Sequence, residues 1–303
     1  MTNEITVTRL IDAPRERVFN AWTDPAALDQ WWGPQGFTTT TERIDIRPGG
    51  AWKYTMLGPD GTEYPNLITY DEIVRPERIT YSHGETEGRP DDFHTTVTFA
   101  DEAGQTRITM TSVFKSAEMR RQALGYGAVQ GGYQTLDKLG EFVAEDPRTM
   151  FITRVFNAPV ERVWRAWTEP ELVKQWWGPE HFTSPGAEID FRVGGKYLFG
   201  MRDPEGNEYW STGEYVEIVP MKRIVYTDSF SDAAGNVVSP QQFGMSAEFP
   251  ESQAITLTFE DLGGQTLLRI SSASMPRDAF FEMARSGMST SLDKLARVVS
   301  TME

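Results

Sequence analysis

The chain has 303 residues, more than a single hydrophobic core usually supports, so its length predicts two domains. Its formal net charge of −15 disfavours nucleic acids and anionic membrane surfaces as partners, because binding to either depends on an excess of lysine and arginine. The sequence contains no cysteine, which excludes disulfides, thiolate metal sites and a thiol nucleophile.

Two copies of one sequence pattern fill the chain. The segment AWTDPAALDQWWGP starts at residue 21 and AWTEPELVKQWWGP starts at residue 166, with further matches on both sides. A repeat of this length is a whole domain and not a solenoid unit. We predict one domain at 1–146 and a second at 147–303, and copy two carries about fifteen extra residues within 228–254.

Each copy is predicted to open with a strand that leads into a helix. Apolar and polar residues alternate at 5–11 and at 151–156, which is typical of strands. Pro14 and Pro159 follow at positions that suit the first turn of a helix, where the backbone N–H has no helical partner. The same order of elements is therefore expected in both copies.

A second short helix is predicted to begin at Pro25 and to end at the Gly-Pro that follows the tryptophan pair. Leu28, Trp31 and Trp32 recur at the spacing that brings residues to one face of a helix. The tryptophan pair thus indicates the end of a helix that is held against an apolar surface.

Segments with a period of two follow in both copies and predict an antiparallel sheet. They lie at 51–57, 78–83, 95–99 and 106–114 in copy one, and at 196–202, 254–259 and 266–274 in copy two. Alternate residues should face the interior. These inward candidates are Trp52, Tyr54, Met56, Ile79, Tyr81, Val97, Phe99, Ile108, Met110 and Phe114, and in copy two Tyr197, Phe199, Met201, Ile224, Tyr226, Ile255, Leu257, Phe259, Leu268 and Ile270.

Each copy ends in a segment with helical periodicity, at 117–144 and at 277–300. The first of these segments contains Gly125, Gly127, Gly131 and Gly132. A glycine inside a helix costs about 1 kcal/mol relative to alanine, so these glycines need a reason. One hypothesis is that copy one keeps an open cavity beneath its last helix, which copy two fills with Phe281 and Met288. A kink or an ordinary loop is the alternative.

The ordered motifs AWTDP, WWGP, a Gly-Gly-aromatic strand entry, an IV-x-x-x-R-I-x-Y segment that contains a proline and a terminal LDKL resemble the AHSA-type family. These are bacterial relatives of the heat-shock-protein-90 ATPase activator, within the START-like (SRPBCC) helix-grip superfamily. The resemblance implies an α+β chain of two tandem helix-grip domains. Each would be a curved antiparallel sheet around a long C-terminal helix, with two short helices after the first strand and an apolar cavity between sheet and helix.

The side chains expected around such a cavity are the candidate ligand contacts. The simplest alternative for any one ring is that it only fills the core, because protein interiors are closely packed. The candidates are Trp22, Trp31, Phe37, Trp52, Tyr54, Met56, Tyr81, His83, Met110, Phe114, Gly125, Ala128 and Gly132 in copy one, and Trp167, Trp176, Tyr197, Phe199, Met201, Tyr226, Phe281 and Met288 in copy two.

Signals of catalysis are sparse. The histidines His83, His94 and His181 have unrelated spacings, and no metal-binding motif or nucleotide loop is present, so we expect no cofactor and no metal. His83 and His94 could lie near the mouth of copy one, where a histidine acting as acid or base would suit a cyclase. Copy two has Asp228 at the position of His83.

Three functions remain open at this stage, because the superfamily includes carriers, cyclases and receptors and a fold alone does not choose among them. The first is a non-enzymatic protein that binds or sequesters an apolar or aromatic small molecule. The second is an aromatase or cyclase acting on a polyketide-type substrate, and the third is a co-regulator of a chaperone ATPase. We expect a cytoplasmic protein that is a monomeric pseudo-dimer or a homodimer, since no secretory signal or membrane span is visible.

Overall fold

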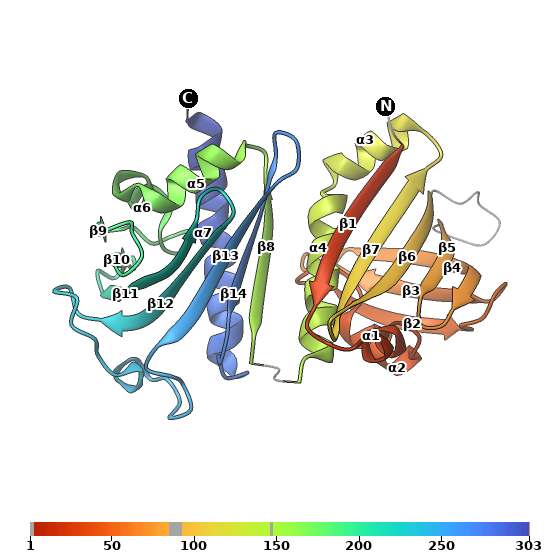
Figure 1. The fold of residues 1–303 in the computed structure, drawn as a ribbon, viewed down its shortest axis with the longest axis horizontal. Coiled ribbons are helices and arrows are strands. Elements are labelled where there is room, and N and C mark those ends of the chain that lie inside the picture. Colours follow the sequence, from red (N-terminus) through yellow and green to blue (C-terminus); the bar gives the residue numbers. More distant parts are fainter. Residues whose placement is uncertain (1–2, 85–92, 146–147, 303) are drawn as a thin grey trace. The chain divides into compact units, whose positions relative to one another are not determined.

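The computed structural model describes residues 3–84, 93–145 and 148–302. The chain divides into two compact units, one ending at Pro147 and the other beginning at Arg148. Each unit contains a seven-stranded antiparallel sheet together with helices (Figure 1). The predicted fold class, an α+β chain of two tandem helix-grip domains, is confirmed.

The first unit consists of β1 (Glu4–Ile11), α1 (Arg15–Trp22), α2 (Pro25–Trp31), β2 (Thr38–Ile44), β3 (Ala51–Leu57), β4 (Glu63–Val74), β5 (Arg78–Gly84), β6 (Phe93–Glu102), β7 (Gln105–Phe114), α3 (Ala117–Gly125) and α4 (Ala128–Val143). The second consists of β8 (Met150–Phe156), α5 (Val160–Thr168), α6 (Pro170–Trp176), β9 (Ala187–Ile189), β10 (Lys196–Arg202), β11 (Glu208–Val219), β12 (Arg223–Ser231), a 3₁₀ turn (Pro240–Phe243), β13 (Gln253–Asp261), β14 (Thr266–Ser272) and α7 (Ala279–Thr301). No helix of the described ranges is long and apolar enough to cross a membrane.

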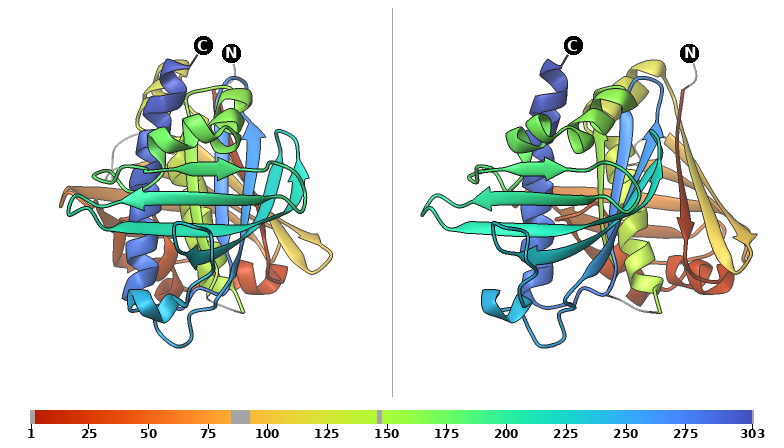
Figure 2. Two further views of the ribbon diagram at one scale, coloured as in Figure 1. Left: turned by 90° about the vertical axis from the view of Figure 1, so that its left-hand side faces the viewer. Right: turned by 60° about the vertical axis from the view of Figure 1, so that its left-hand side comes forward.

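Both sheets have the same topology. The strand order is β1-β7-β6-β5-β4-β3-β2 in the first unit and β8-β14-β13-β12-β11-β10-β9 in the second, so the opening strand of each unit pairs with its last strand. Figure 2 shows the strands of the second unit curving around α7. The inner face of the curve carries the alternate apolar residues of each strand, and this face and the last helix enclose the core.

The first tryptophan of each WWGP motif joins the two short helices. The indole N–H of Trp31 donates to the carbonyl oxygen of Ala21 at 3.1 Å, and that of Trp176 donates to Ala166 at 2.9 Å. Both indole rings are fully buried. Because a buried donor without a partner is costly, this bond fixes the second helix against the first. The role of Trp31 and Trp176 is therefore structural.

The repeated LDKL motif fastens the last helix of each unit at two places. In the first unit, Asp137 pairs with Arg9 of β1 at 2.9 Å, and Lys138 donates to the carbonyl oxygen of Phe37 at 3.2 Å. In the second unit, Asp293 pairs with Arg154 of β8, and Lys294 donates to the carbonyl of Phe182 at 2.8 Å. The aspartate thus holds the opening strand, and the lysine holds the loop after WWGP.

The last helix of the first unit is not continuous, which corrects the single segment predicted over 117–144. It breaks between α3 and α4 at Gly127, whose φ of +78° lies in the left-handed region that glycine adopts without strain. No residue of α3 is buried. The alternative of a kink or loop therefore explains part of the glycine cluster. In the second unit, α7 runs without a break over the corresponding length.

Candidate ligand-binding site

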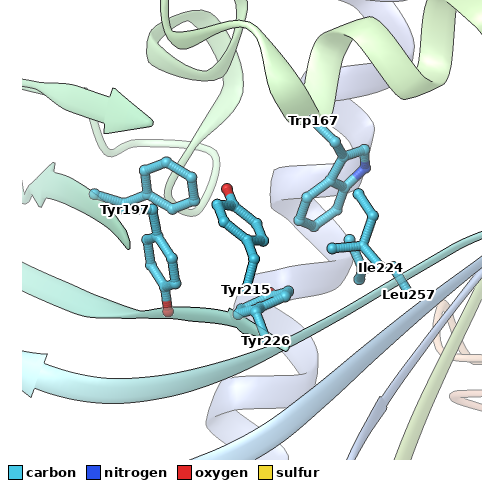
Figure 3. Close-up of a pocket in the computed structure, with 7 residues that line it drawn as sticks. Trp167, Tyr197, Tyr215, Ile224, Tyr226 and Leu257 are labelled. Atoms are coloured by element: carbon cyan, nitrogen blue, oxygen red, sulfur yellow. The ribbon is translucent and has the colours of Figure 1, made fainter. Parts of the chain in front are cut away.

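A small cavity lies inside the second unit, between the inner face of the sheet and α5 (Figure 3). Five rings and two aliphatic side chains line it: Trp167, Tyr197, Phe199, Tyr215, Ile224, Tyr226 and Leu257. The volume open to the centre of a water molecule is about 10 Å³, close to the minimum that one water needs. In its present shape the cavity holds no larger guest.

The cavity exists because rings that meet at steep angles leave space between them. Tyr197 meets Tyr226 edge to face, with ring centroids 5.4 Å apart and an interplanar angle of 87°. Tyr215 also meets Tyr226 at a steep angle. On the opposite side, the indole N–H of Trp167 is buried and has no hydrogen-bond partner among the described residues. The wall thus consists of rings and aliphatic side chains, and one of these rings carries a polar group whose hydrogen-bonding capacity is unused.

The carboxylate of Asp228 contacts Tyr197, one of the residues that line the cavity. The Tyr197 hydroxyl donates to Asp228 Oδ1 at 2.5 Å and approaches the carbonyl oxygen of Thr227 at 3.1 Å. Asp228 is half-buried, and its burial raises the pKa of its carboxyl group, while hydrogen bonds from Tyr197 and Ser211 oppose that rise. Burial, followed by the nearby Asp228 charge, also raises the pKa of Tyr197. Tyr197 therefore stays protonated and acts as a donor at neutral pH.

Two further polar side chains continue from Asp228 across the sheet. Gln253 of β13 is opposite Asp228 in the strand register, and Ser272 of β14 donates to Gln253 Oε1 at 2.9 Å. Gln253 is 6% exposed, and its side-chain nitrogen Nε2 has no partner among the described residues. We call Asp228, Gln253 and Ser272 the polar row. It adds an acceptor and an unused donor to a mainly apolar interior.

The extra residues of copy two lie within the connection between β12 and β13 (Figure 1), and part of them forms a segment that we call the cover. Phe249 of this cover, defined as residues 239–250, packs against Phe230 and Phe280 with ring centroids 5.9 and 5.3 Å apart. Phe230 is the next residue after Asp228 on the same face of β12. The hydrogen bonds that the structure shows for the cover run within the segment itself.

The first unit has a different polar chain at the matching place. The indole N–H of Trp32 donates to the Tyr54 hydroxyl at 3.0 Å, and that hydroxyl lies 3.4 Å from His83 Nε2. His83 stacks on Phe93, with ring centroids 4.6 Å apart. His94, which was expected near the mouth, lies on the other face of β6, because side chains alternate along a strand, and is paired with Asp71 at 3.3 Å.

Four of the predicted contacts, Trp167, Tyr197, Phe199 and Tyr226, line the cavity together. The hypothesis that copy one keeps an open cavity beneath its last helix, which copy two fills, stays a prediction, because no residue of α7 lines the cavity of the second unit. Phe281 is buried but packs between the guanidinium groups of Arg277 and Arg285, at 4.8 Å from each, and does not reach the cavity. Neither Met288 nor Met201 lines it; both are partly buried at other places in the second unit.

In the first unit six of the thirteen predicted contacts are buried in the packed core. Trp22 meets Trp32, and Trp32 meets Trp52, in edge-to-face contacts, and the buried residues of this set are Trp22, Trp31, Trp52, Tyr54, Tyr81 and Phe114. Phe37, Met56, Met110, Ala128 and Gly132 are partly buried, as is His83. Gly125 is exposed, which corrects its placement in an interior site.

The helix glycines of the first unit also permit close packing. A β-carbon on Gly132 would lie 3.3 Å from both methyl carbons of Val7, and one on Gly131 would lie 3.3 Å from Pro34. The small residues therefore let α4 approach its neighbours, and at these two positions they do not open a cavity. Tyr215, Gln253 and Ser272 of the candidate site in the second unit were not identified from the sequence. Tyr215 lies on a strand that was not predicted, and Gln253 precedes the segment predicted at 254–259.

Comparison with known proteins relates both halves to one family. The family model described as Activator of Hsp90 ATPase homolog 1-like protein matches residues 12–144 and again residues 157–300. The curated proteins contain no match to the chain.

Solved structures that are similar to the chain each correspond to about half of it. Protein Ms6760 from Mycobacterium smegmatis is 27% identical, with 48% of this chain and 92% of that chain covered and a TM-score of 0.44. Protein CV1439 from Chromobacterium violaceum is 31% identical, with 52% and 99% covered and a TM-score of 0.42. The AHSA1 protein SPO3351 from Silicibacter pomeroyi is 21% identical, with 50% and 97% covered and a TM-score of 0.42.

Proposed function

We propose that the second unit binds a small apolar or aromatic molecule without transforming it. The premise is that this chain belongs, in both of its halves, to the Activator of Hsp90 ATPase homolog 1-like family. The observation that carries this proposal is the cavity lined by five rings between the sheet and the helices. Binding sites for small molecules are mostly apolar and aromatic, with a few polar groups that orient the ligand. Asp228, which the lining residue Tyr197 contacts, and Gln253, which is opposite Asp228 in the register, are candidates for such groups.

The cover supplies a route for a ligand to enter a cavity that is now too small for it. Its hydrogen bonds are internal, so its attachment to the rest of the unit depends on ring contacts such as Phe249 with Phe230. Segments held by few contacts open locally at a lower free energy than the strands beside them. The cover can therefore move aside while β12 and β13 stay paired, and the lining rings can then turn to admit a guest.

Thermal unfolding of the full chain in the presence of apolar ligands tests this function. The panel contains naphthalene derivatives, aromatic polyketides and fatty acids. A ligand that binds only the folded state should stabilise it by about 2.7 kcal/mol when present at one hundred times its dissociation constant, which raises the melting temperature. If no compound of the panel changes the melting temperature, the proposal is wrong.

The variant Phe249→Ala tests whether the ligand binds in the second unit. Loss of this ring should loosen the cover and speed ligand dissociation, as measured by stopped-flow tryptophan fluorescence. Phe142→Ala is the matched control, because Phe142 is an exposed phenylalanine of the first unit and the substitution is the same. Equal dissociation rates in the two variants would show that the cover does not retain the ligand.

An enzyme of the cyclase kind is the second candidate, and the contact between Tyr54 and His83 favours it. A histidine can remove a proton from carbon next to a carbonyl group, and burial keeps Tyr54 protonated as a donor because it raises the pKa of the phenol. With a poly-β-keto thioester as substrate, His83→Ala should then reduce turnover about a hundredfold or more. Asp228→Asn, the change at the matching place in the second unit, should leave turnover unchanged. Turnover that survives His83→Ala removes this candidate.

A further inference from the structure

The polar row has an unbalanced charge. Asp228 has no ion-pair partner among the described residues, and the groups that act on its carboxyl are two hydroxyls, those of Tyr197 and Ser211. A carboxylate that is partly removed from water without a cation is unfavourable, because hydroxyl hydrogen bonds replace only part of its hydration. Such a charge is stabilised when a ligand brings the missing cation.

Gln253 provides a second and independent indication of a ligand. Its Oε1 accepts from Ser272, but its buried Nε2 has no partner among the described residues. Buried amide donors are nearly always paired in folded proteins. Since Gln253 is opposite Asp228 in the register of β12 and β13, the unused donor and the unbalanced carboxylate belong to one site. A ligand oxygen next to the cationic group would satisfy this donor.

The rings of the cavity suit the same kind of ligand. The faces of tyrosine and tryptophan rings attract cations as well as apolar groups. Tyr197 belongs to both places, because its ring lines the cavity and its hydroxyl donates to Asp228. A molecule with an aromatic body in the cavity would thus present its polar end to the polar row.

We propose that the ligand of the second unit is a protonated arylalkylamine that carries an oxygen beside its amino group. The ammonium group pairs with Asp228, the oxygen accepts from Gln253 Nε2, and the aryl group enters the cavity beneath Trp167. This inference rests on the proposed function and specifies its ligand class. The first unit has His83 and Phe93 at the places of Asp228 and Gln253, so the preference for an amine belongs to the second unit alone.

Isothermal titration calorimetry of the full chain at pH 7 with three probes of nearly equal shape tests the inference. The probes are 2-phenylethanol, 2-phenylethylamine and 2-amino-1-phenylethanol. We expect the amine to bind about tenfold or more tighter than the neutral alcohol, because hydrogen bonds to a charged group are the stronger ones. The amino alcohol should bind tighter still, and Gln253→Leu should remove this last difference only.

Asp228→Asn should abolish the preference for amines while the protein stays folded. The Oδ1 of asparagine accepts the hydrogen bond from Tyr197, its Nδ2 can donate to the Ser211 oxygen, and burial already disfavours the charge that the substitution removes. Asp71→Asn, the same substitution at an exposed residue of β4 in the first unit, is the matched control and should leave all three affinities unchanged. The comparison of the probes on the unchanged protein needs no variant, so a folding defect cannot obscure the result.

The outcomes separate the two proposals. Equal affinities for 2-phenylethanol and 2-phenylethylamine would overturn the amine inference and leave apolar binding intact. A preference for amines that persists in Asp228→Asn would overturn the role of Asp228. Failure of all three probes, when other apolar compounds raise the melting temperature, overturns the ligand class, whereas failure of every compound overturns the proposed function itself.

Discussion

Asp137→Ala is expected to destabilise the first unit by about 3 to 5 kcal/mol, because it removes the buried carboxylate that pairs with the buried guanidinium group of Arg9. Arg9 is 7% exposed and Asp137 is 1% exposed, so water cannot replace the lost carboxylate. The pair also joins α4 to β1, the strand that α4 packs against. The loss is measured as a lower urea concentration at the unfolding midpoint of the first unit, in a urea titration monitored by far-UV circular dichroism.

The second unit contains the matched control. Its pair, Arg154 with Asp293, has the same place in the fold, but the aspartate is 47% exposed. Asp293→Ala should therefore cost about 1 kcal/mol or less, as exposed ion pairs do. The double change Arg9→Met with Asp137→Leu should recover most of the stability, because it replaces both buried charges by apolar side chains. Equal losses in Asp137→Ala and Asp293→Ala would show that burial does not set the cost.

Gly213→Ala is expected to destabilise the second unit by about 3 kcal/mol, at the upper end of the cost of overpacking. A β-carbon on this residue of β11 would lie 1.7 Å from the carbonyl oxygen of Thr227, so the backbones of β11 and β12 would have to separate. It would also lie 3.0 Å from the ring of Tyr197. The substitution should therefore displace the hydroxyl that binds Asp228 and weaken ligand binding together with stability.

Gly125→Ala is the control for this substitution. A β-carbon there meets no atom within 4 Å, and the residue lies at the end of a helix, so the change should be neutral or stabilise by about 0.5 to 1 kcal/mol. Both variants are compared by their urea midpoints. If Gly213→Ala unfolds at the same urea concentration as the unchanged protein, the strands accommodate the methyl group and the steric argument is wrong.

Much of the fold could be predicted because apolar periodicity marks buried faces. The strands β3 and β10 were predicted with their observed bounds, and the helices before and after Pro25 were also correct. β2 was missed because its sequence, TTTTERI, has little apolar alternation, and it is an edge strand whose outer residues meet water. The reason for the glycines around Gly127 was left open between a cavity and a kink, because the sequence alone does not show which neighbours a glycine contacts.

The candidate site was only half predictable. Rings such as Tyr197 and Tyr226 were identified from alternation, but the same pattern describes core residues and cavity residues alike. The contact of Tyr197 with Asp228 depends on the pairing of three strands, which the sequence does not specify. The pairing of Asp228 with Gln253 was likewise hidden, because the length of the insertion between them conceals that they are neighbours.

The pairing of Asp228 with Gln253 affects which parts of the sequence can change during evolution. Asp228 and Gln253 form the base of the long β12–β13 connection, and strand register is set by the residues that pair and not by the number of residues beyond them. Loop closure becomes only slowly less favourable as a loop grows. Mutations that shorten, lengthen or rewrite the connection therefore leave the carboxylate and the amide in place. Natural variation can in this way adjust which molecules gain admission while conserving the groups that recognise them.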